Sequence, residues 1–276
     1  MPVAIVTGSV QGIDKTIAFR LSNDGFDVVI ADMGSKQPLM MDVVTQITSK
    51  GKKAHWIEVD VSKQDEVEAL VAKTVKVFGE LNVMVANAGI LDTTGILEIS
   101  LEAWERTMSV NVRGIFLCHR TAARQMIKQG KRGKLIAASS ISGYRPSGKA
   151  PAYCTSKWAV RGLTQTCALE LGQHGITANS YCPGSVPTPM SLQFAERLGK
   201  EQGITDPEEM YKKSSHRTSA LPVDLETEDI AALVSFLAGK DSNRITGQSL
   251  ICDGGKCYSL KRHRNNYSFR LGICFS

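Results

Sequence analysis

Short apolar runs alternate with longer segments of helical periodicity along almost the whole chain. The first unit shows the pattern: residues 3–6 are apolar, a glycine-containing turn follows, and Ile17, Ala18 and Leu21 then repeat on one helical face. A second apolar run occupies residues 28–31. Short apolar runs bounded by turn residues are typical of buried strands, and 3-to-4 spacing is typical of helices. The pattern therefore predicts a strand, a helix and a strand.

The same alternation continues to residue 252. Apolar runs predict further strands at residues 54–59, 83–86, 134–138, 176–181 and 249–252. Helical spacing predicts helices at residues 39–50, 67–78, 101–111, 112–129 and 226–238, and one that begins at Pro151. Strands that alternate with helices favour a parallel sheet covered on both faces. We therefore expect one doubly wound α/β domain of the Rossmann type over residues 1–255, followed by a tail at residues 256–276.

The turn after the first strand carries the first chemical signal. Gly8 and Gly12 lie between a predicted strand and a predicted helix. In such a unit the free backbone N–H groups and the dipole of the helix N-terminus favour a pyrophosphate. Asp32 ends the second strand, where a carboxylate accepts hydrogen bonds from an adenosine ribose and repels a 2′-phosphate. We expect a dinucleotide site that prefers NAD, while the nearby Lys36 keeps NADP as an alternative.

Composition and residue spacing argue against a membrane protein or a metalloprotein. Of the 276 residues, 42% are hydrophobic and 22% are charged, which is ordinary for a globular protein. No apolar run reaches the roughly 18 residues of a membrane span. The N-terminus does not resemble a secretory signal, so we expect a cytoplasmic protein. The seven cysteines and five histidines are scattered without ligand spacing, and we expect reduced thiols and no metal.

The net charge of +6 is concentrated in one segment. Residues 256–276 contain five basic residues and no acidic ones, so the rest of the chain has a net charge of only +1. A basic surface for polyanions would have to be formed by this tail alone. We expect no nucleic-acid partner and no membrane partner.

A second chemical signal follows the strand predicted at residues 134–138. Tyr153 and Lys157 are four residues apart and share a helical face if Pro151 opens a helix. An unperturbed phenol has a pKa of about 10, and a neighbouring ammonium lowers that pKa toward the range useful for proton exchange. Ser140 precedes Tyr153 by thirteen residues, and its hydroxyl is suited to hold a substrate oxygen. Taken alone, the pair also fits a solvated helical face.

Together these motifs resemble the short-chain dehydrogenase/reductase family. The resemblance spans residues 3–255 and rests on the order of the glycine turn, the carboxylate after the second strand, the serine and the Tyr-x-x-x-Lys pair. It implies that Tyr153 is the general acid or base and that Lys157 lowers the Tyr153 pKa and holds the nicotinamide ribose. It also implies that Ser140 orients the substrate oxygen and that Asn111 completes a proton relay.

The resemblance further implies a set of residues that bind NAD(H). Asp60 matches the family's adenine-contacting aspartate, and Asn87 belongs to the family's turn after the fourth strand, with Ala86 in place of a first asparagine. Thr188 matches the residue near the nicotinamide carboxamide. The implied set is Gly8, Gln11, Gly12, Ile13, Asp32, Asp60, Val61, Asn87, Gly89, Tyr153, Lys157, Pro183, Gly184, Val186 and Thr188.

Asp14 departs from the family pattern. The family's glycine motif is Thr-Gly-x-x-x-Gly-x-Gly, and Asp14 stands where the third glycine belongs. That glycine allows close packing of helix and strand, and a carboxylate there would repel the pyrophosphate. We expect Lys15 to offset part of the charge. The departure leaves open a second class of function, a Rossmann-fold binding protein that has lost catalysis.

Four segments carry a closer resemblance to diacetyl/acetoin reductases, also called 2,3-butanediol dehydrogenases. They are residues 159–166, 181–184, 188–190 and 246–250. Most of them belong to the scaffold, so they indicate kinship more than specificity. We expect a small hydroxyketone or diketone as substrate, with an alcohol or ketone of secondary metabolism as the alternative. Residues 189–216 are expected to form the lid over the pocket.

The resemblance implies a homotetramer or homodimer, because the family's C-terminus lies near a subunit interface of a tetramer. Residues 256–276 do not resemble the family's short apolar ending. We therefore expect this tail to influence assembly.

Overall fold

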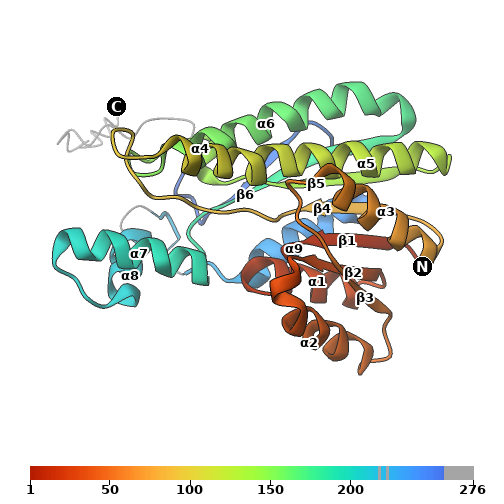
Figure 1. Ribbon diagram of the computed structural model, residues 1–276, viewed down its shortest axis with the longest axis horizontal. Helices are drawn as coiled ribbons and strands as arrows, with labels where there is room; N and C mark the ends of the chain where they lie inside the picture. The colour runs from red at the N-terminus through yellow and green to blue at the C-terminus, as the bar shows by residue number, and fades with distance from the viewer. Residues whose placement is uncertain (217–218, 222–223, 258–276) are drawn as a thin grey trace, which may run out of the picture.

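A computed structural model describes residues 1–216, 219–221 and 224–257 of the chain (Figure 1). Within these residues, seven parallel strands form one sheet with the order β3-β2-β1-β4-β5-β6-β7. The strands are β1 (Val3–Thr7), β2 (Asp27–Asp32), β3 (Ala54–Glu58), β4 (Val83–Ala86), β5 (Gly133–Ala138), β6 (Ile176–Pro183) and β7 (Ser249–Cys252). The predicted doubly wound α/β fold is confirmed.

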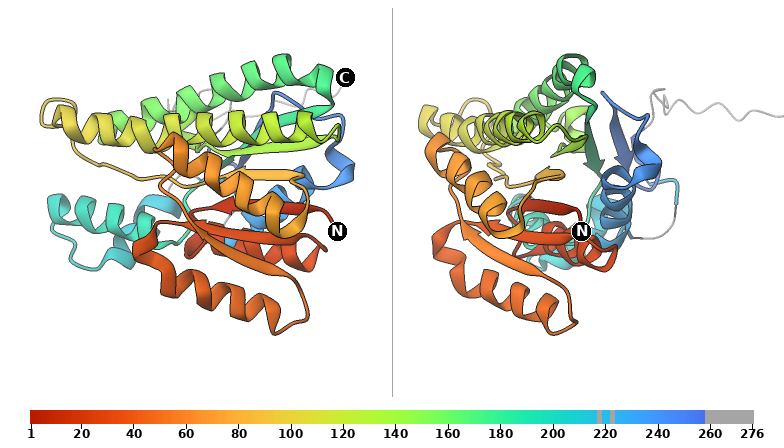
Figure 2. Two further views of the ribbon diagram at one scale, coloured as in Figure 1. Left: turned by 45° about the vertical axis from the view of Figure 1, so that its right-hand side comes forward. Right: turned by 90° about the vertical axis from the view of Figure 1, so that its right-hand side faces the viewer.

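Helices cover both faces of the sheet (Figure 2). The helices α1, α2 and α9 pack on one face, and α3, α5 and α6 pack on the other. The described helices are α1 (Gly12–Asn23), α2 (Gln37–Thr48), α3 (Gln64–Phe78), α4 (Leu101–Met108), α5 (Ile115–Lys128), α6 (Pro151–Leu171), α7 (Pro189–Gln202), α8 (Pro207–His216) and α9 (Thr227–Ala238).

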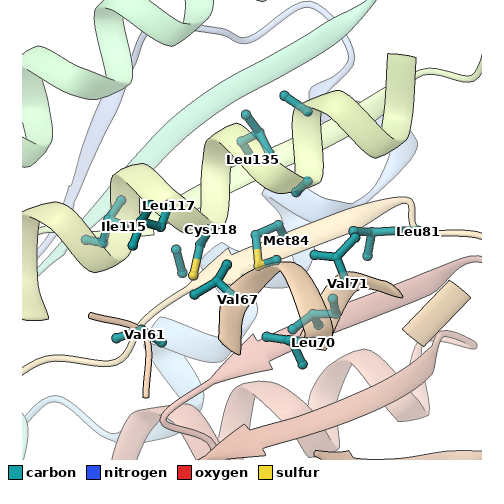
Figure 3. Close-up of a cluster of buried hydrophobic side chains, with 14 of the residues drawn as sticks. Val61, Val67, Leu70, Val71, Leu81, Met84, Ile115, Leu117, Cys118 and Leu135 are labelled. Carbon is teal, nitrogen blue, oxygen red and sulfur yellow. The ribbon is translucent and has the colours of Figure 1, made fainter. Parts of the chain in front are cut away.

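The central strands are apolar between their ends because helices bury both of their faces. Every residue of β1, β2 and β4 is buried. Figure 3 shows part of the core between the sheet and the helices α3 and α5, where Val67 and Leu70 of α3 meet Met84 of β4 and Cys118 of α5. This packing fixes the strands and therefore fixes the positions of the loops at their carboxyl ends.

The helix expected at residues 101–111 and the one expected at residues 112–129 are joined without a break. A π-helix, Ser109–Gly114, lies between α4 and α5. Gly114 permits the close approach of Val61, because a Cβ atom on Gly114 would lie 2.8 Å from the Cγ2 atom of Val61. A π-helical turn inside an α-helix is often found at a functional site, and this one contains Asn111.

The segment expected to form a lid contains the helices α7 and α8, which pack against each other through Ala195, Met210 and Tyr211. They project from the end of the molecule toward which the strands run (Figure 1). In the part of the chain that the structure describes, no helix is long and apolar enough to cross a membrane, and no cluster of residues has a metal-ligating composition. Residues 258–276, most of the expected tail, lie outside the described residues.

We predict that His119 makes the protein less stable in mild acid. His119 on α5 is 1% exposed, and burial lowers its pKa from 6.5 to about 4. Between these values the unfolded chain binds more protons than the folded one, so the free energy of unfolding decreases as the pH falls. The contribution is about 1.4 kcal/mol per pH unit, or roughly 3 kcal/mol over the full window.

Urea unfolding at pH 7 and pH 5 measures this effect. The variant His119→Leu should lose roughly 2 kcal/mol less stability between these pH values than the wild type does. The exposed His174 provides a control, since His174→Gln should behave as the wild type. Equal losses in His119→Leu and the wild type would show that another group causes the acid sensitivity.

Candidate active site

The expected site residues lie at the carboxyl ends of the strands. The strand order reverses between β1 and β4, because the crossover from β1 leads to β2 on one side while β4 continues the sheet on the other. In open α/β sheets such a point leaves a crevice that binds ligands. Thr7 at the end of β1 accepts hydrogen bonds from the backbone N–H groups of Asn87 (3.0 Å) and Ala88 (3.1 Å), which joins the two sides of the crevice.

The glycine turn exposes backbone where side chains would interfere. Gly8 (φ 76°) and Gly12 (φ 58°) adopt left-handed conformations that favour glycine. A Cβ atom on Gly8 would lie 3.0 Å from the Cα atom of Ala88, and one on Gly12 would lie 3.3 Å from the Cγ2 atom of Thr188. Gln11 precedes the helix and provides no side-chain cap. The bare turn and uncapped helix N-terminus fit a pyrophosphate group.

Asp32 is in place to meet an adenosine ribose. Its side chain is 6% exposed at the end of β2, and one oxygen accepts a hydrogen bond from the backbone N–H of Met33 at 2.8 Å. The ammonium of Lys36 lies 3.4 Å from the Asp32 carboxylate. Lys36 is therefore paired with the carboxylate that would bind ribose hydroxyls.

Asp14 turns back over the glycine turn. Its Oδ2 atom would lie 3.0 Å from a Cβ atom on Gly8, and the side chain of Asn87 forms a hydrogen bond with its carboxyl group. Burial raises the pKa of Asp14 well above its usual value, and this effect exceeds the stabilisation of the carboxylate by Asn87.

The expectation that Lys15 offsets the charge of Asp14 is wrong. The ammonium of Lys15 lies 3.7 Å from the carboxylate of Asp42 on α2. The cations that act on Asp14 are Lys157 and Lys36, which come from α6 and from the turn after β2.

Ser140, Tyr153 and Lys157 come together at the start of α6. Ser140 forms a side-chain hydrogen bond with Tyr153, and the ammonium of Lys157 lies 5.3 Å from the centroid of the Tyr153 ring. Burial nevertheless raises the pKa of Tyr153 to about 12. This shift is opposite to the one expected from a neighbouring ammonium, because the cost of burying a phenolate outweighs the effect of nearby polar groups.

Lys157 is itself held deep in the crevice. It is 4% exposed, and its ammonium donates a hydrogen bond to the backbone carbonyl of Ala138 at 2.8 Å. Burial lowers the pKa of Lys157 to about 8, and the negative charge of Asp14 opposes this shift. A Cβ atom on Gly89 would lie 3.7 Å from the Lys157 nitrogen, so the turn after β4 packs closely against this side chain.

Asn111 connects three elements of the site. Its side-chain nitrogen donates hydrogen bonds to the carbonyl of Ile90 (2.9 Å) and to the hydroxyl of Ser156 (3.1 Å), and its oxygen accepts one from the N–H of Ile90 (2.8 Å). Ser156 directly precedes Lys157. Among the described hydrogen bonds, none joins Asn111 directly to Tyr153 or Lys157. Asn111 is instead connected to this pair through Ser156, whose hydroxyl donates a hydrogen bond to the backbone carbonyl of Tyr153.

The remaining expected residues lie around the rim of the crevice. Asp60 accepts hydrogen bonds from the backbone (3.0 Å) and the hydroxyl (2.7 Å) of Ser62. Burial acts to raise the pKa of Asp60, but the two hydrogen bonds outweigh it, and the pKa is lowered. Val61 is buried against Gly114, so its side chain belongs to the core.

Pro183, Gly184, Val186 and Thr188 connect β6 to the lid. A Cβ atom on Gly184 would lie 2.8 Å from the Cα atom of Asp253, which explains the glycine at this position. Thr188 caps α7 by accepting a hydrogen bond from the N–H of Ser191 at 3.3 Å. Because Thr188 also contacts Gly12, this segment joins the lid to the glycine turn.

Tyr181 was not expected among the site residues. It is 1% exposed on β6, and among the described residues its hydroxyl has no hydrogen-bond partner. Burial raises its pKa, and the charges of Asp14 and Tyr153 raise it further, so Tyr181 lies near both groups although it packs in the core with residues of α1 and α9. The sequence signal was a bulky aromatic residue inside the apolar run that ends at Pro183, which by itself is more typical of a core residue.

Comparisons with known proteins agree with this geometry. The profile of the short chain dehydrogenase family matches residues 2–198. The chain is 42% identical over 253 residues to a short-chain dehydrogenase/reductase of Armillaria gallica, covering 92% of this chain and 95% of the relative. It is 41% identical over 255 residues to a diacetyl reductase [(S)-acetoin forming] of Staphylococcus epidermidis, covering 92% and 98%.

A solved structure extends the comparison to the fold. The acetoin dehydrogenase YohF of Salmonella typhimurium superposes with a TM-score of 0.79 at 32% sequence identity, covering 92% of this chain and 96% of that one. With a family profile over most of the chain and relatives of similar length, the protein belongs to the short-chain dehydrogenase family.

Proposed function

We propose that this protein is an NAD(H)-dependent oxidoreductase that interconverts a secondary alcohol and a ketone. The observation that carries the proposal is the contact of the Tyr153 and Ser140 hydroxyl groups beside the buried ammonium of Lys157, at the crevice that the bare glycine turn also lines. These groups suit a proton exchange with a substrate oxygen next to a dinucleotide.

Ketone reduction follows from the protonation states of these side chains. A phenol with a pKa of about 12 keeps its proton at neutral pH, so Tyr153 is a proton donor in the free protein. In this proposal Ser140 donates a hydrogen bond to the carbonyl oxygen, and the Tyr153 proton moves to that oxygen as the alkoxide forms. Lys157 then stabilises the phenolate. When bound, the nicotinamide supplies hydride-transfer chemistry.

The residues that we propose to hold the cofactor all belong to the domain predicted at residues 1–255. The backbone of Gln11, Gly12 and Ile13 would meet the pyrophosphate, and Asp32 would accept hydrogen bonds from the adenosine ribose. Asp60 and Val61 would border the adenine. The nicotinamide half would contact Lys157 and the segments that contain Asn87, Gly89, Pro183, Gly184, Val186 and Thr188.

Asn111 is proposed as a positioning residue. Its hydrogen bonds to Ile90 and Ser156 tie the π-helix to the turn after β4 and to α6. A fixed Ser156 limits the positions open to Lys157, which follows it. A proton relay that passes near Asn111 would begin from this arrangement.

A small hydroxyketone or diketone, such as acetoin or diacetyl, is the substrate we propose first. The support is the 41% identity to a protein named diacetyl reductase and the similarity to a solved acetoin dehydrogenase. An alcohol or ketone of secondary metabolism is the alternative, since relatives 42% identical to the chain are named only as short-chain dehydrogenase/reductases, with no substrate. A binding protein without catalysis is the third candidate, which the carboxyl group of Asp14 at the glycine turn favours.

A second copy of the chain is proposed to cover the outer face of α4, α5 and α6. An apolar groove of about 870 Å³ runs along this face, and Phe116 in its lining is 40% exposed. Acidic and basic side chains border it together, which permits pairing between two copies. The lining residues are Glu102, Trp104, Glu105, Arg106, Met108, Ser109, Val112, Arg113, Phe116 and Leu163.

We predict that Tyr153→Phe lowers kcat for diacetyl reduction by about 10²- to 10⁴-fold, because the variant lacks the proton donor. NADH affinity, measured by fluorescence titration, should change little. Tyr144→Phe is the matched control, since the Tyr144 hydroxyl donates to the carbonyl of Ser249 (2.5 Å) and has no part in the proposed reaction. Near-normal turnover by Tyr153→Phe would refute the proposed mechanism.

We predict that Asp32→Ala shifts cofactor preference toward NADPH. The variant removes the ribose hydrogen-bond acceptor and the repulsion of a 2′-phosphate, and it frees Lys36 from its ion pair. The ratio of kcat/KM for NADH to that for NADPH should fall by about tenfold or more, equal to at least roughly 1.4 kcal/mol. The exposed Asp42 supplies the control Asp42→Ala. An unchanged ratio would mean that Asp32 does not discriminate between the cofactors.

We predict that Phe116→Glu lowers the molar mass of the protein in solution. A carboxylate in place of the ring would have to lose its water at the proposed interface and would remove the apolar contact of Phe116, which is costly. Light scattering after size-exclusion chromatography measures the mass, and Val77→Glu on α3 is a control at another exposed apolar position. A wild type that is monomeric, or a mass that Phe116→Glu leaves unchanged, would contradict the proposed interface.

A further inference from the structure

Asp14 lies where the proposed function places the pyrophosphate of the cofactor. It belongs to the first turn of α1, directly after Gly12 and Ile13, whose backbone N–H groups would face the phosphates. Its Oδ2 atom reaches back to within 3.0 Å of a Cβ atom built on Gly8. The carboxyl group of Asp14 therefore lies against the glycine turn.

Charged and polar groups from every neighbouring element face Asp14. Among the described residues, no ion pair joins it to a cation: Lys36 is paired with Asp32 at 3.4 Å, and Lys157 donates to the carbonyl of Ala138 at 2.8 Å. The facing groups are Asp32 from β2, Lys36 from the turn after β2, Asn87 from the turn after β4, Lys157 from α6 and Tyr181 from β6. An ionised Asp14 would thus rely on one hydrogen bond, from Asn87, and on distant cations.

A second observation points to a polar ligand at the same place. The buried hydroxyl of Tyr181, whose pKa is raised by burial and further by the charges of Asp14 and Tyr153, has no hydrogen-bond partner among the described residues. Buried polar groups in native proteins nearly always have a partner, and an unpaired one is explained by a water or ligand. A polar group bound beside Asp14 would give the Tyr181 hydroxyl a partner.

We propose that Asp14 binds the dinucleotide as the neutral acid and donates a hydrogen bond to it, so that cofactor binding takes up a proton from solvent. This inference rests on the proposed function. An ionised carboxylate one residue from the pyrophosphate contacts would oppose a dianionic group. A neutral carboxyl group removes that repulsion and supplies an O–H donor. The direction in which burial shifts the Asp14 pKa supports this assignment.

Calorimetric titration with NADH between pH 6 and pH 9, in buffers with different ionisation enthalpies, measures both affinity and proton uptake. The wild type should lose affinity with rising pH more steeply than Asp14→Asn, by up to about tenfold per pH unit. It should also take up as much as about one proton more per NADH. The pH dependence that Asp14→Asn retains reports Lys157 and other groups. Asp42→Asn, outside the crevice, should match the wild type.

Asp14→Gly is a second variant, which should lose the same part of the pH dependence. Equal pH profiles and equal proton uptake in the wild type and both variants would overturn the inference. So would binding by the variants together with no binding by the wild type at pH 6, because neutral Asp14 would then exclude the cofactor. Failure of all three folded proteins to bind NADH or NADPH at any pH would refute the proposed function and this inference with it.

Discussion

The reversal of strand order between β1 and β4 is the constraint on which the site depends. Parallel pairing brings the carboxyl ends of the strands to one edge, and the reversal leaves a crevice between the turn after β1 and the turn after β4. Thr7 holds the two turns together through two hydrogen bonds. The strands on either side are buried, so the core sets the positions of the two turns that contain Gly8 and Asn87.

Burial has opposite consequences for the groups that share this crevice. It keeps the proton on Tyr153, whose pKa is about 12, and it weakens the hold of Lys157 on its proton, since the Lys157 pKa is about 8. Asp14 is also shifted toward its neutral form. Burial thus disfavours the ionised forms of Tyr153, Lys157 and Asp14, while hydrogen bonds favour the ionised form of Asp60 at the rim.

Much of this architecture could be predicted from the sequence. The apolar runs marked the strands, most clearly the fully buried β1, β2 and β4. The spacing of Tyr153 and Lys157 predicted their shared helical face. The orientation of Lys15 toward Asp42 could not be predicted, because it depends on how α1 packs beside α2. The same holds for the direction of the Tyr153 shift, which depends on burial by distant segments. The π-helix was missed because its residues continue the periodicity of the flanking helices.

The transfer of deuterium from NADH labelled at C4 to diacetyl or acetoin tests the central claim most directly. With deuterium at both C4 positions, we predict that mass spectrometry finds one deuterium on the carbinol carbon of the product and one retained on the oxidised cofactor. A protein that binds NADH but transfers no deuterium to these compounds or to a panel of other ketones would contradict the account. It would identify the chain as a member of the family that retains the fold and the cofactor site without the chemistry.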